Sequence, residues 1–237
     1  MILQYLLVML LLTVASSISV FNNKLTATAG IAGWFIGLLI FAGSGWLGIT
    51  MLSAFFLLGT VSTSFGKEKK QRLGLASGQE SKRTLGQVFA NAGVAALLCL
   101  GMMIVPSYKD ILMLMMAASF ASATADTMSS ELGNVFGTNY INIISFKKDK
   151  RGMDGVISLE GTLIGIAGSI VIASFHCFFK GNISGFFIII IAGTFGNIFD
   201  SILGATAERK KLLTNNGVNF LNTLAGSITA LFMKMFF

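Results

Sequence analysis

Long apolar runs alternate with short polar or basic segments along the whole chain. A helix needs about 20 mostly apolar residues to cross a hydrocarbon core that is ~30 Å thick. Eight runs approach or reach that length, and we expect a transmembrane helix from each: residues 1–20, 25–43, 46–65, 85–105, 110–133, 156–179, 183–205 and 217–237. The pattern predicts an all-α fold, a polytopic integral membrane helix bundle of about eight spans.

Three of these runs need a closer look. The first lacks a basic leading segment and an obvious small-residue cleavage site, so we expect a retained helix rather than a signal peptide. The second and third are joined only by the sequence GSG. They either form a tight hairpin or do not both span the membrane completely.

The composition supports lipid as the solvent of this chain. Of its 237 residues, 54% are hydrophobic and 11% are charged, and the mean hydropathy is +0.79. A soluble domain carries about 25% charged residues. We expect a single membrane domain over residues 1–237, with three N-terminal helices in 1–65 and a catalytic bundle in 66–237. The polar loops are expected near 66–84, 134–155 and 206–216.

The basic residues predict the orientation of the bundle. All of the 17 Lys and Arg residues fall on one side of the predicted membrane except Lys109, Lys180 and Lys234. By the positive-inside rule the basic side is cytoplasmic, which places both termini on the non-cytoplasmic side. The net charge of +7 is therefore mainly a topology signal, and nothing in it points to nucleic acid.

Polar residues within the runs recur at helical spacing and collect toward the cytoplasmic ends. Lipid cannot satisfy such groups, so we expect these stripes to face one another inside the bundle. Four runs carry a stripe of this kind: Arg83, Gln87 and Asn91; Ser158, Gly161, Thr162, Gly165 and Ser169; Thr194, Asn197, Asp200, Ser201 and Gly204; Asn215, Asn219, Asn222, Thr223 and Gly226. For the glycines and hydroxyls, plain helix packing explains the pattern equally well.

The acids in this region favour a function. A charge inside a span is costly, so Asp126, Glu131 and Asp200 indicate a functional site. Asp126 and Glu131 lie five residues apart, about 140° around a regular helix and ~7.5 Å along it. They cannot bind one ligand from a straight helix. Either the segment unwinds near the sequence TADT, or the two acids have different roles.

Carboxylates with amide and hydroxyl neighbours are the oxygen ligands that Mg²⁺ prefers when it also holds substrate phosphates. Lys and Arg beside them bind phosphate and stabilise charge during its transfer. The combination indicates a membrane-embedded site for a water-soluble polyphosphate and a lipid-like partner. The chain has no P-loop, kinase glycine loop or GxSxG motif.

Several motifs resemble a known family. The segments FANAGVAALL, ASATADTMSSELG, DGVISLEGTLIGIAGS, FGNIFDSILGAT and NNGVNFLNTLAGSITAL occur in the order found in the membrane family called domain of unknown function 92. This family includes transmembrane protein 19 and the plant phytyl-phosphate kinases. The resemblance begins near Gly66 and runs to the C-terminus. Met128 and Ser129 depart from the family pattern, which usually has Trp-Ala between the acids.

The resemblance implies an activity in isoprenoid metabolism. The plant relatives phosphorylate phytyl monophosphate to the diphosphate with a nucleoside triphosphate, CTP being favoured. On this chain the family motif positions fall at Asn91, Asp126, Thr127, Glu131, Ser158, Asp200, Ser201, Gly204, Asn219 and Asn222.

We therefore expect a Mg²⁺-dependent kinase of the cell membrane of a bacterium or archaeon, with its active site facing the cytoplasm. It would transfer a phosphoryl group from CTP or another nucleotide to a phytyl- or geranylgeranyl-phosphate-like acceptor. Asp126 and Asp200 are expected to bind the metal, and Glu131 to assist the metal or a neighbour. The expected substrate-binding residues are Lys82, Arg83, Asn91, Lys148, Arg151, Ser158, Asn197, Ser201, Asn219 and Asn222.

Two other functions fit the same residues. A transporter of an organic anion or an ion-coupled solute would use intramembrane acids and amides as its substrate site, usually near the bilayer midplane. A nucleotidyltransferase that moves CMP to a lipid phosphate would use the same metal site.

Overall fold

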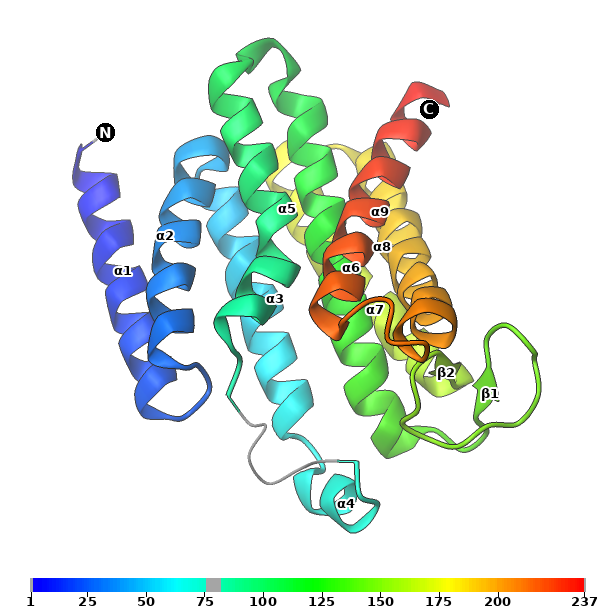
Figure 1. Ribbon diagram of the computed structural model, residues 1–237. Coiled ribbons are helices and arrows are strands. Elements are labelled where there is room, and N and C mark those ends of the chain that lie inside the picture. Colours follow the sequence, from blue (N-terminus) through cyan, green and yellow to red (C-terminus); the bar gives the residue numbers. More distant parts are fainter. Residues whose placement is uncertain (1, 76–81, 237) are drawn as a thin grey trace.

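Helices make up almost all of the computed structural model, which describes residues 2–75 and 82–236 (Figure 1). The long helices within those ranges are α1 (Ile2–Phe21), α2 (Ala27–Ser44), α3 (Trp46–Ser64), α5 (Leu85–Ile104), α6 (Lys109–Phe136), α7 (Leu159–Lys180), α8 (Ile183–Leu203) and α9 (Asn215–Phe236). The shorter elements are α4 (Lys67–Arg72), η1 (Pro106–Tyr108), η2 (Gly204–Glu208), and the antiparallel strands β1 (Ile141–Asn142) and β2 (Val156–Ile157).

The all-α, polytopic membrane architecture is confirmed. Seven helices of the described chain, α1 to α3 and α5 to α8, are long and apolar enough to cross a membrane. The eighth predicted span corresponds to α9, which has 22 residues but begins with the polar sequence NNGVNFLNT. Its length suffices for a crossing, and Val218, Asn222 and Thr223 of its first half are buried inside the bundle.

Helix α6 is the centre of the bundle. It packs against α3, α5, α7, α8 and α9, and every residue of its segment 116–125 is buried. Most of these residues are Ala, Ser or Thr, whose small side chains let neighbouring backbones approach. The partners supply glycines at the contacts: a Cβ on Gly165 of α7 would lie 3.0 Å from the Ala125 carbonyl oxygen.

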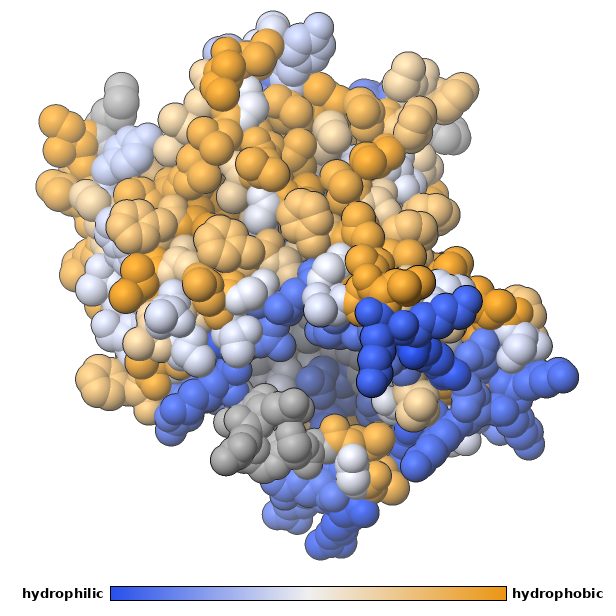
Figure 2. All heavy atoms as spheres, in the orientation of Figure 1, coloured by the Kyte–Doolittle hydropathy of each residue, from blue (hydrophilic) through white to orange (hydrophobic). Residues whose placement is uncertain are grey.

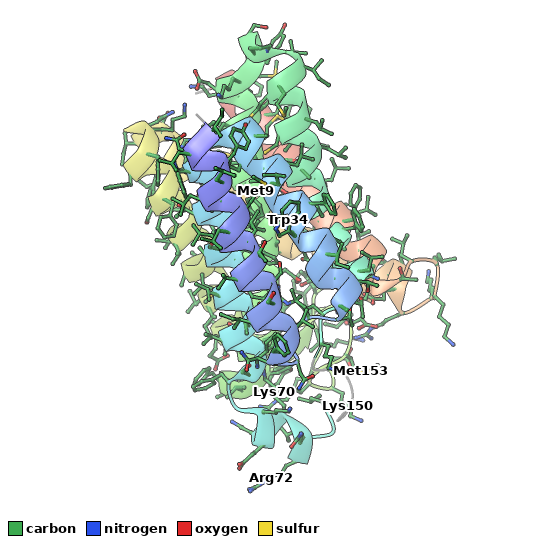
Figure 3. All side chains as sticks on the ribbon, turned by 90° about the vertical axis from the view of Figure 1, so that its left-hand side faces the viewer. Met9, Trp34, Lys70, Arg72, Lys150 and Met153 are labelled. Carbon is green, nitrogen blue, oxygen red and sulfur yellow. The ribbon has the colours of Figure 1, made fainter. Side chains whose placement is uncertain are left out.

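The N-terminal helices form one side of the bundle. Helix α1 packs on α2, where the Trp34 indole donates a hydrogen bond to Thr13 Oγ1 at 3.0 Å (Figure 3). Helix α2 packs on α5, and α3 packs on α6 and α7. The turn between α2 and α3 is made by Gly45 at φ +68°, a conformation that favours glycine. The tight-hairpin alternative is therefore the one observed, and both helices have spanning length.

The two ends of the bundle differ in polarity. Both termini lie at the end where α6 begins and α7 ends (Figure 1). At that end the Lys180 ammonium group forms a salt bridge with Asp110 at 2.8 Å. The opposite end carries α4, the β1–β2 loop and most hydrophilic side chains, while the face above it is apolar (Figure 2). The assignment of the polar end to the cytoplasm remains a prediction. Residues 76–81 of the expected loop 66–84 lie outside the described residues.

We predict that close packing around α6 limits side-chain size at Gly193 of α8. A Cβ there would lie 2.8 Å from Ala121 Cβ and 2.5 Å from Ser169 Oγ. Gly193→Val should therefore lower stability by about 1–3 kcal/mol. In detergent, the apparent Tm should fall by several degrees. Gly33→Val on α2 is the matched control, because a Cβ at Gly33 has no atom within 4 Å. Equal Tm losses in the two variants would contradict the packing account.

Candidate active site

A cavity of about 510 Å³ opens at the polar end of the bundle. Helices α3 and α5 to α9 contribute to its walls, together with α4 and the loops at this end. Of the residues predicted to form the site, those that line it are Lys82, Arg83, Asn91, Asp126, Glu131, Ser158, Asn197, Asp200, Ser201 and Asn219. The prediction that the polar stripes converge is confirmed, because side chains from all four stripes share this cavity.

Two aspartates from facing helices meet in the cavity wall. The carboxyl groups of Asp126 on α6 and Asp200 on α8 lie within hydrogen-bonding range of each other. Asn222 of α9 donates to Asp200 Oδ2 at 3.4 Å, and its own side-chain oxygen accepts from Ser122. Asn222 is thus fully buried behind the cavity and orients Asp200 instead of lining the site. Two carboxylates so close together need a shared proton or a bound cation.

Glu131 has a partner of its own. Helix α6 continues without a break from Lys109 to Phe136, so the segment TADT does not unwind. Glu131 instead accepts from Lys70 of α4 at 2.6 Å. Lys70 also donates to the Ser62 and Thr63 carbonyl oxygens at 2.9 and 3.3 Å, and only 4% of it is exposed (Figure 3). The different-roles alternative holds: Glu131 ties α4 to α6, while Asp126 faces α8.

Arg83 presents a guanidinium group to the cavity. Its backbone is fixed by the α1–α2 loop, since Arg83 N–H donates to the Lys24 carbonyl at 2.9 Å. The guanidinium carbon lies 5.2 and 5.5 Å from the ring centres of Phe55 and Phe56 on α3. Within residues 2–75 and 82–236 the group forms no ion pair. A guanidinium held by aromatic rings, with Glu131 near enough to interact with it electrostatically but not in direct contact, is suited to bind an anion.

The loop between α6 and α7 is fixed against the end of α8. Arg209 donates to the Asp154 carbonyl at 2.7 Å and to Asp149 Oδ2 at 2.9 Å. The backbone N–H of Lys150, together with Arg209, holds the pKa of Asp149 below its usual value. Gly155, at φ +70°, packs directly on Ala205 of the π-helical turn η2. These contacts bring the loop against the cavity mouth.

Two of the predicted phosphate-binding residues lie in this loop but do not line the cavity. Arg151 donates to the Gly137 carbonyl at 2.8 Å, and its guanidinium stacks 4.6 Å from the Tyr140 ring centre. Lys148 is exposed on the β1 side of the loop. The structure does not support the predicted contact of these two side chains with phosphate, because Arg151 is occupied by loop contacts and Lys148 points to solvent.

The donor set fits a metal that is completed by its substrate. Among the described residues, no group of three or more His, Cys, Asp or Glu is placed to hold a metal ion. Asp126 and Asp200 provide facing carboxylates, and Mg²⁺ is commonly bound by one or two carboxylates plus substrate phosphates. The amide oxygen of Asn197, which accepts from Ser129 at 3.0 Å, lies in the same cavity.

Comparison with known proteins places the chain in a family. The family model described as integral membrane protein DUF92 matches residues 9–227. The chain belongs to this family. The match starts within α1, so the family likeness includes the N-terminal helices and not only the part after Gly66. No solved structure matches this DUF92 protein.

Curated relatives cover most of the chain. "Uncharacterized membrane protein sll0875" of Synechocystis sp. is 32% identical over 90% of this chain and 88% of its own length. "Protein VTE6, chloroplastic" of Arabidopsis thaliana is 31% identical over 90% of this chain and 66% of its own length. "Uncharacterized membrane protein MJ0933" of Methanocaldococcus jannaschii is 33% identical over 87% of this chain and 83% of its own length.

The DUF92 cavity also contains charged residues that the sequence analysis did not single out: Lys24, Lys67, Lys70, Asp154 and Glu208. In the sequence the lysines look only like topology signals, and the two acids lie outside the predicted polar stripes. In addition, α5, α7 and α9 all begin at the cavity, where their helix dipoles favour an anion.

We predict that the Lys70–Glu131 pair holds α4 in place. Lys70→Met leaves Glu131 and two carbonyl groups without their donor, which should cost about 2–4 kcal/mol. The apparent Tm in detergent measures this loss. Arg72→Met in the same short helix is the control, because 84% of the Arg72 side chain is exposed and its pair with Glu68 spans 3.9 Å. A Tm change no larger for Lys70→Met than for Arg72→Met would refute the prediction.

Proposed function

We propose that this DUF92 protein is a kinase that transfers the γ-phosphoryl group of CTP, or of another nucleoside triphosphate, to a prenyl monophosphate. The facing carboxylates of Asp126 and Asp200 carry this proposal, because they share a cavity with Arg83, a cation that forms no direct ion pair among the described residues. The resemblance of the motifs to the plant phytyl-phosphate kinases supports the same class of acceptor. By the positive-inside rule, the reaction would take place on the cytoplasmic side.

The reaction needs positioning and charge neutralisation more than a strong base. An oxygen of the acceptor's phosphate attacks the γ-phosphorus and forms the new P–O bond. The bond from that phosphorus to the bridging β–γ oxygen breaks, and the nucleoside diphosphate leaves with the electron pair. Bound Mg²⁺ would neutralise charge on the phosphates.

The chain's own residues divide these tasks. Asp126 and Asp200 would hold the metal, with Asn222 keeping Asp200 in position. Arg83 would bind a phosphate group from the α3 side, and Lys82 would reach the nucleotide from the exposed rim. The size of the cavity, about 510 Å³, falls within the usual range of ligand sites.

The position of the cavity favours an enzyme over a transporter. Transporter sites tend to lie near the bilayer midplane, at broken helices. Here α6 is continuous, and the cavity opens at the polar end of the bundle. Nucleotidyl transfer would use the same residues, so the position of the radiolabel in the nucleotide must separate the two reactions.

We predict that both aspartates are required for transfer. Purified protein in detergent is given Mg²⁺, geranylgeranyl monophosphate and CTP labelled at the γ-phosphate. Label should appear in a lipid diphosphate, and Asp126→Asn or Asp200→Asn should lower kcat by at least ~100-fold. Asp110→Asn is the matched control, because Asp110 is 90% exposed at the opposite end of the bundle. It should retain activity close to that of the unchanged protein.

Two outcomes would contradict the kinase, and a third would contradict only the proposed metal ligands. Label that enters the lipid only from α-labelled CTP would indicate nucleotidyl transfer. Absence of any transfer with CTP or ATP, while the folded protein binds an anionic solute, would indicate transport. Full activity of both aspartate variants would leave the reaction but remove the proposed metal ligands.

We predict that Arg83 binds substrate phosphate. Replacing it by Gln removes a charged donor worth about 1.5–3 kcal/mol, which corresponds to roughly a 10- to 100-fold rise in KM for the nucleotide or the acceptor. Arg83→Lys should restore only part of the affinity, because a lysine cannot reproduce the planar fork. Arg72→Gln, on the exposed face of α4, should leave KM unchanged. Unaltered KM values for both substrates in Arg83→Gln would exclude this role.

A further inference from the structure

A second cavity of about 490 Å³ lies outside the polar site, between α2, α5 and α9. Its lining is almost entirely apolar. Helix α5 supplies one continuous face of it, with residues at positions 86, 89, 90, 93, 96, 97 and 100. We call this second cavity the α5 groove. From Gly86 to Leu100 it extends about 21 Å along the helix, more than half of a ~30 Å hydrocarbon core.

The α5 groove and the polar cavity lie on two sides of the same helix ends. In the first turns of α5, Gln87 and Asn91 line the polar cavity, whereas Gly86 and Ala90 line the groove. At the start of α9, Asn215 and Asn219 line the cavity, whereas Asn216 and Gly217 line the groove. The first turns of α5 and α9 therefore separate the polar cavity from the apolar groove.

The floor of the groove is made by small residues. Gly86 and Gly93 of α5 and Gly217 of α9 leave backbone instead of side chain facing it. At Gly93 an added Cβ would lie 3.6 Å from Phe220 Cε2, an ordinary contact distance. Phe220 of α9 thus borders the groove beside Gly93.

We propose that the α5 groove binds the hydrocarbon chain of the lipid monophosphate, while its phosphate enters the polar cavity between the first turns of α5 and α9. The identity of this ligand rests on the proposed function. The anionic head group is matched by Arg83, which lines the polar cavity and forms no direct ion pair among the described residues. The groove determines which chain lengths are accepted, because it continues to Leu100 without a polar residue on α5.

A photoreactive substrate tests the position of the chain directly. Geranylgeranyl monophosphate carrying a diazirine near the end of its chain is bound to purified protein, irradiated and mapped by peptide mass spectrometry. We expect labelled peptides from α5 and α9, and protection by unmodified geranylgeranyl monophosphate. Geranylgeraniol, which lacks the phosphate, and dioleoyl phosphatidylglycerol should protect far less.

Substitution of Gly93 tests the groove in turnover. Gly93→Phe fills the channel and should raise KM for geranylgeranyl monophosphate at least ~10-fold, since lost contact with only two methylene groups has this effect. Turnover of isopentenyl monophosphate, whose chain ends before Gly93, should change less than about twofold. Gly93→Ala should behave like the unchanged protein. Gly33→Phe, on α2 with open space around it, controls for an added phenyl group on a lipid-facing helix.

The outcomes separate this inference from the kinase proposal. Labelling of α5 and α9 without phosphoryl transfer would support binding of the hydrocarbon chain in the groove and contradict the kinase proposal. Phosphoryl transfer with labelling elsewhere would overturn the proposed role of the groove and leave the kinase proposal intact. Transfer with equal effects of Gly93→Phe and Gly33→Phe would mean the same. Equal protection by phosphatidylglycerol means that ordinary membrane lipid fills the groove, which also overturns the inference.

Discussion

The close approach of Asp126 and Asp200 is the constraint on which the rest of this bundle depends. Two carboxylates inside a membrane protein repel each other and have little water to stabilise them. Bringing them together requires α6 and α8 to pack closely, which the small residues of α6 and the glycines of its partners allow. It also requires a buried amide, Asn222, to orient one of them. The central helix is thus built around the acid pair.

The distribution of charge around this pair follows from the same constraint. The acids of the cavity lie at the polar end of the bundle, where cations can reach them. Lys70 neutralises Glu131 and fixes α4, while Arg83 is left facing the cavity. The starts of α5, α7 and α9 add their N-terminal dipoles at this end. The polarity of the site therefore results from helix direction as well as from side chains.

Much of this arrangement could be predicted from the sequence because the solvent is lipid. The lengths of the apolar runs predicted the eight long helices. Because lipid cannot satisfy polar side chains, the sequence also predicted that Asn91, Asp200 and Asn219 converge. The contacts made by loop residues cannot be predicted in this way. Lys70 looked like one more basic loop residue, yet it is buried, and Arg151 looked like a phosphate ligand, yet it stacks on Tyr140. Such roles depend on where loops cross in space, which periodicity does not encode.

A reaction between a nucleotide and a lipid phosphate requires a site where water and the hydrocarbon region of the membrane adjoin. At the bilayer midplane the nucleotide would have to lose water across about half of a ~30 Å core, at a cost of many kcal/mol for its charges. At the helix ends only the lipid's phosphate must move, and it already resides near that depth. The first turns of α5 and α9, which separate the polar cavity from the α5 groove, would therefore let each proposed substrate remain in its own solvent. At this boundary Gly86 of α5 packs against the Asn216 side chain of α9, so the two helices are in contact where the proposed acceptor's phosphate would reach the cavity.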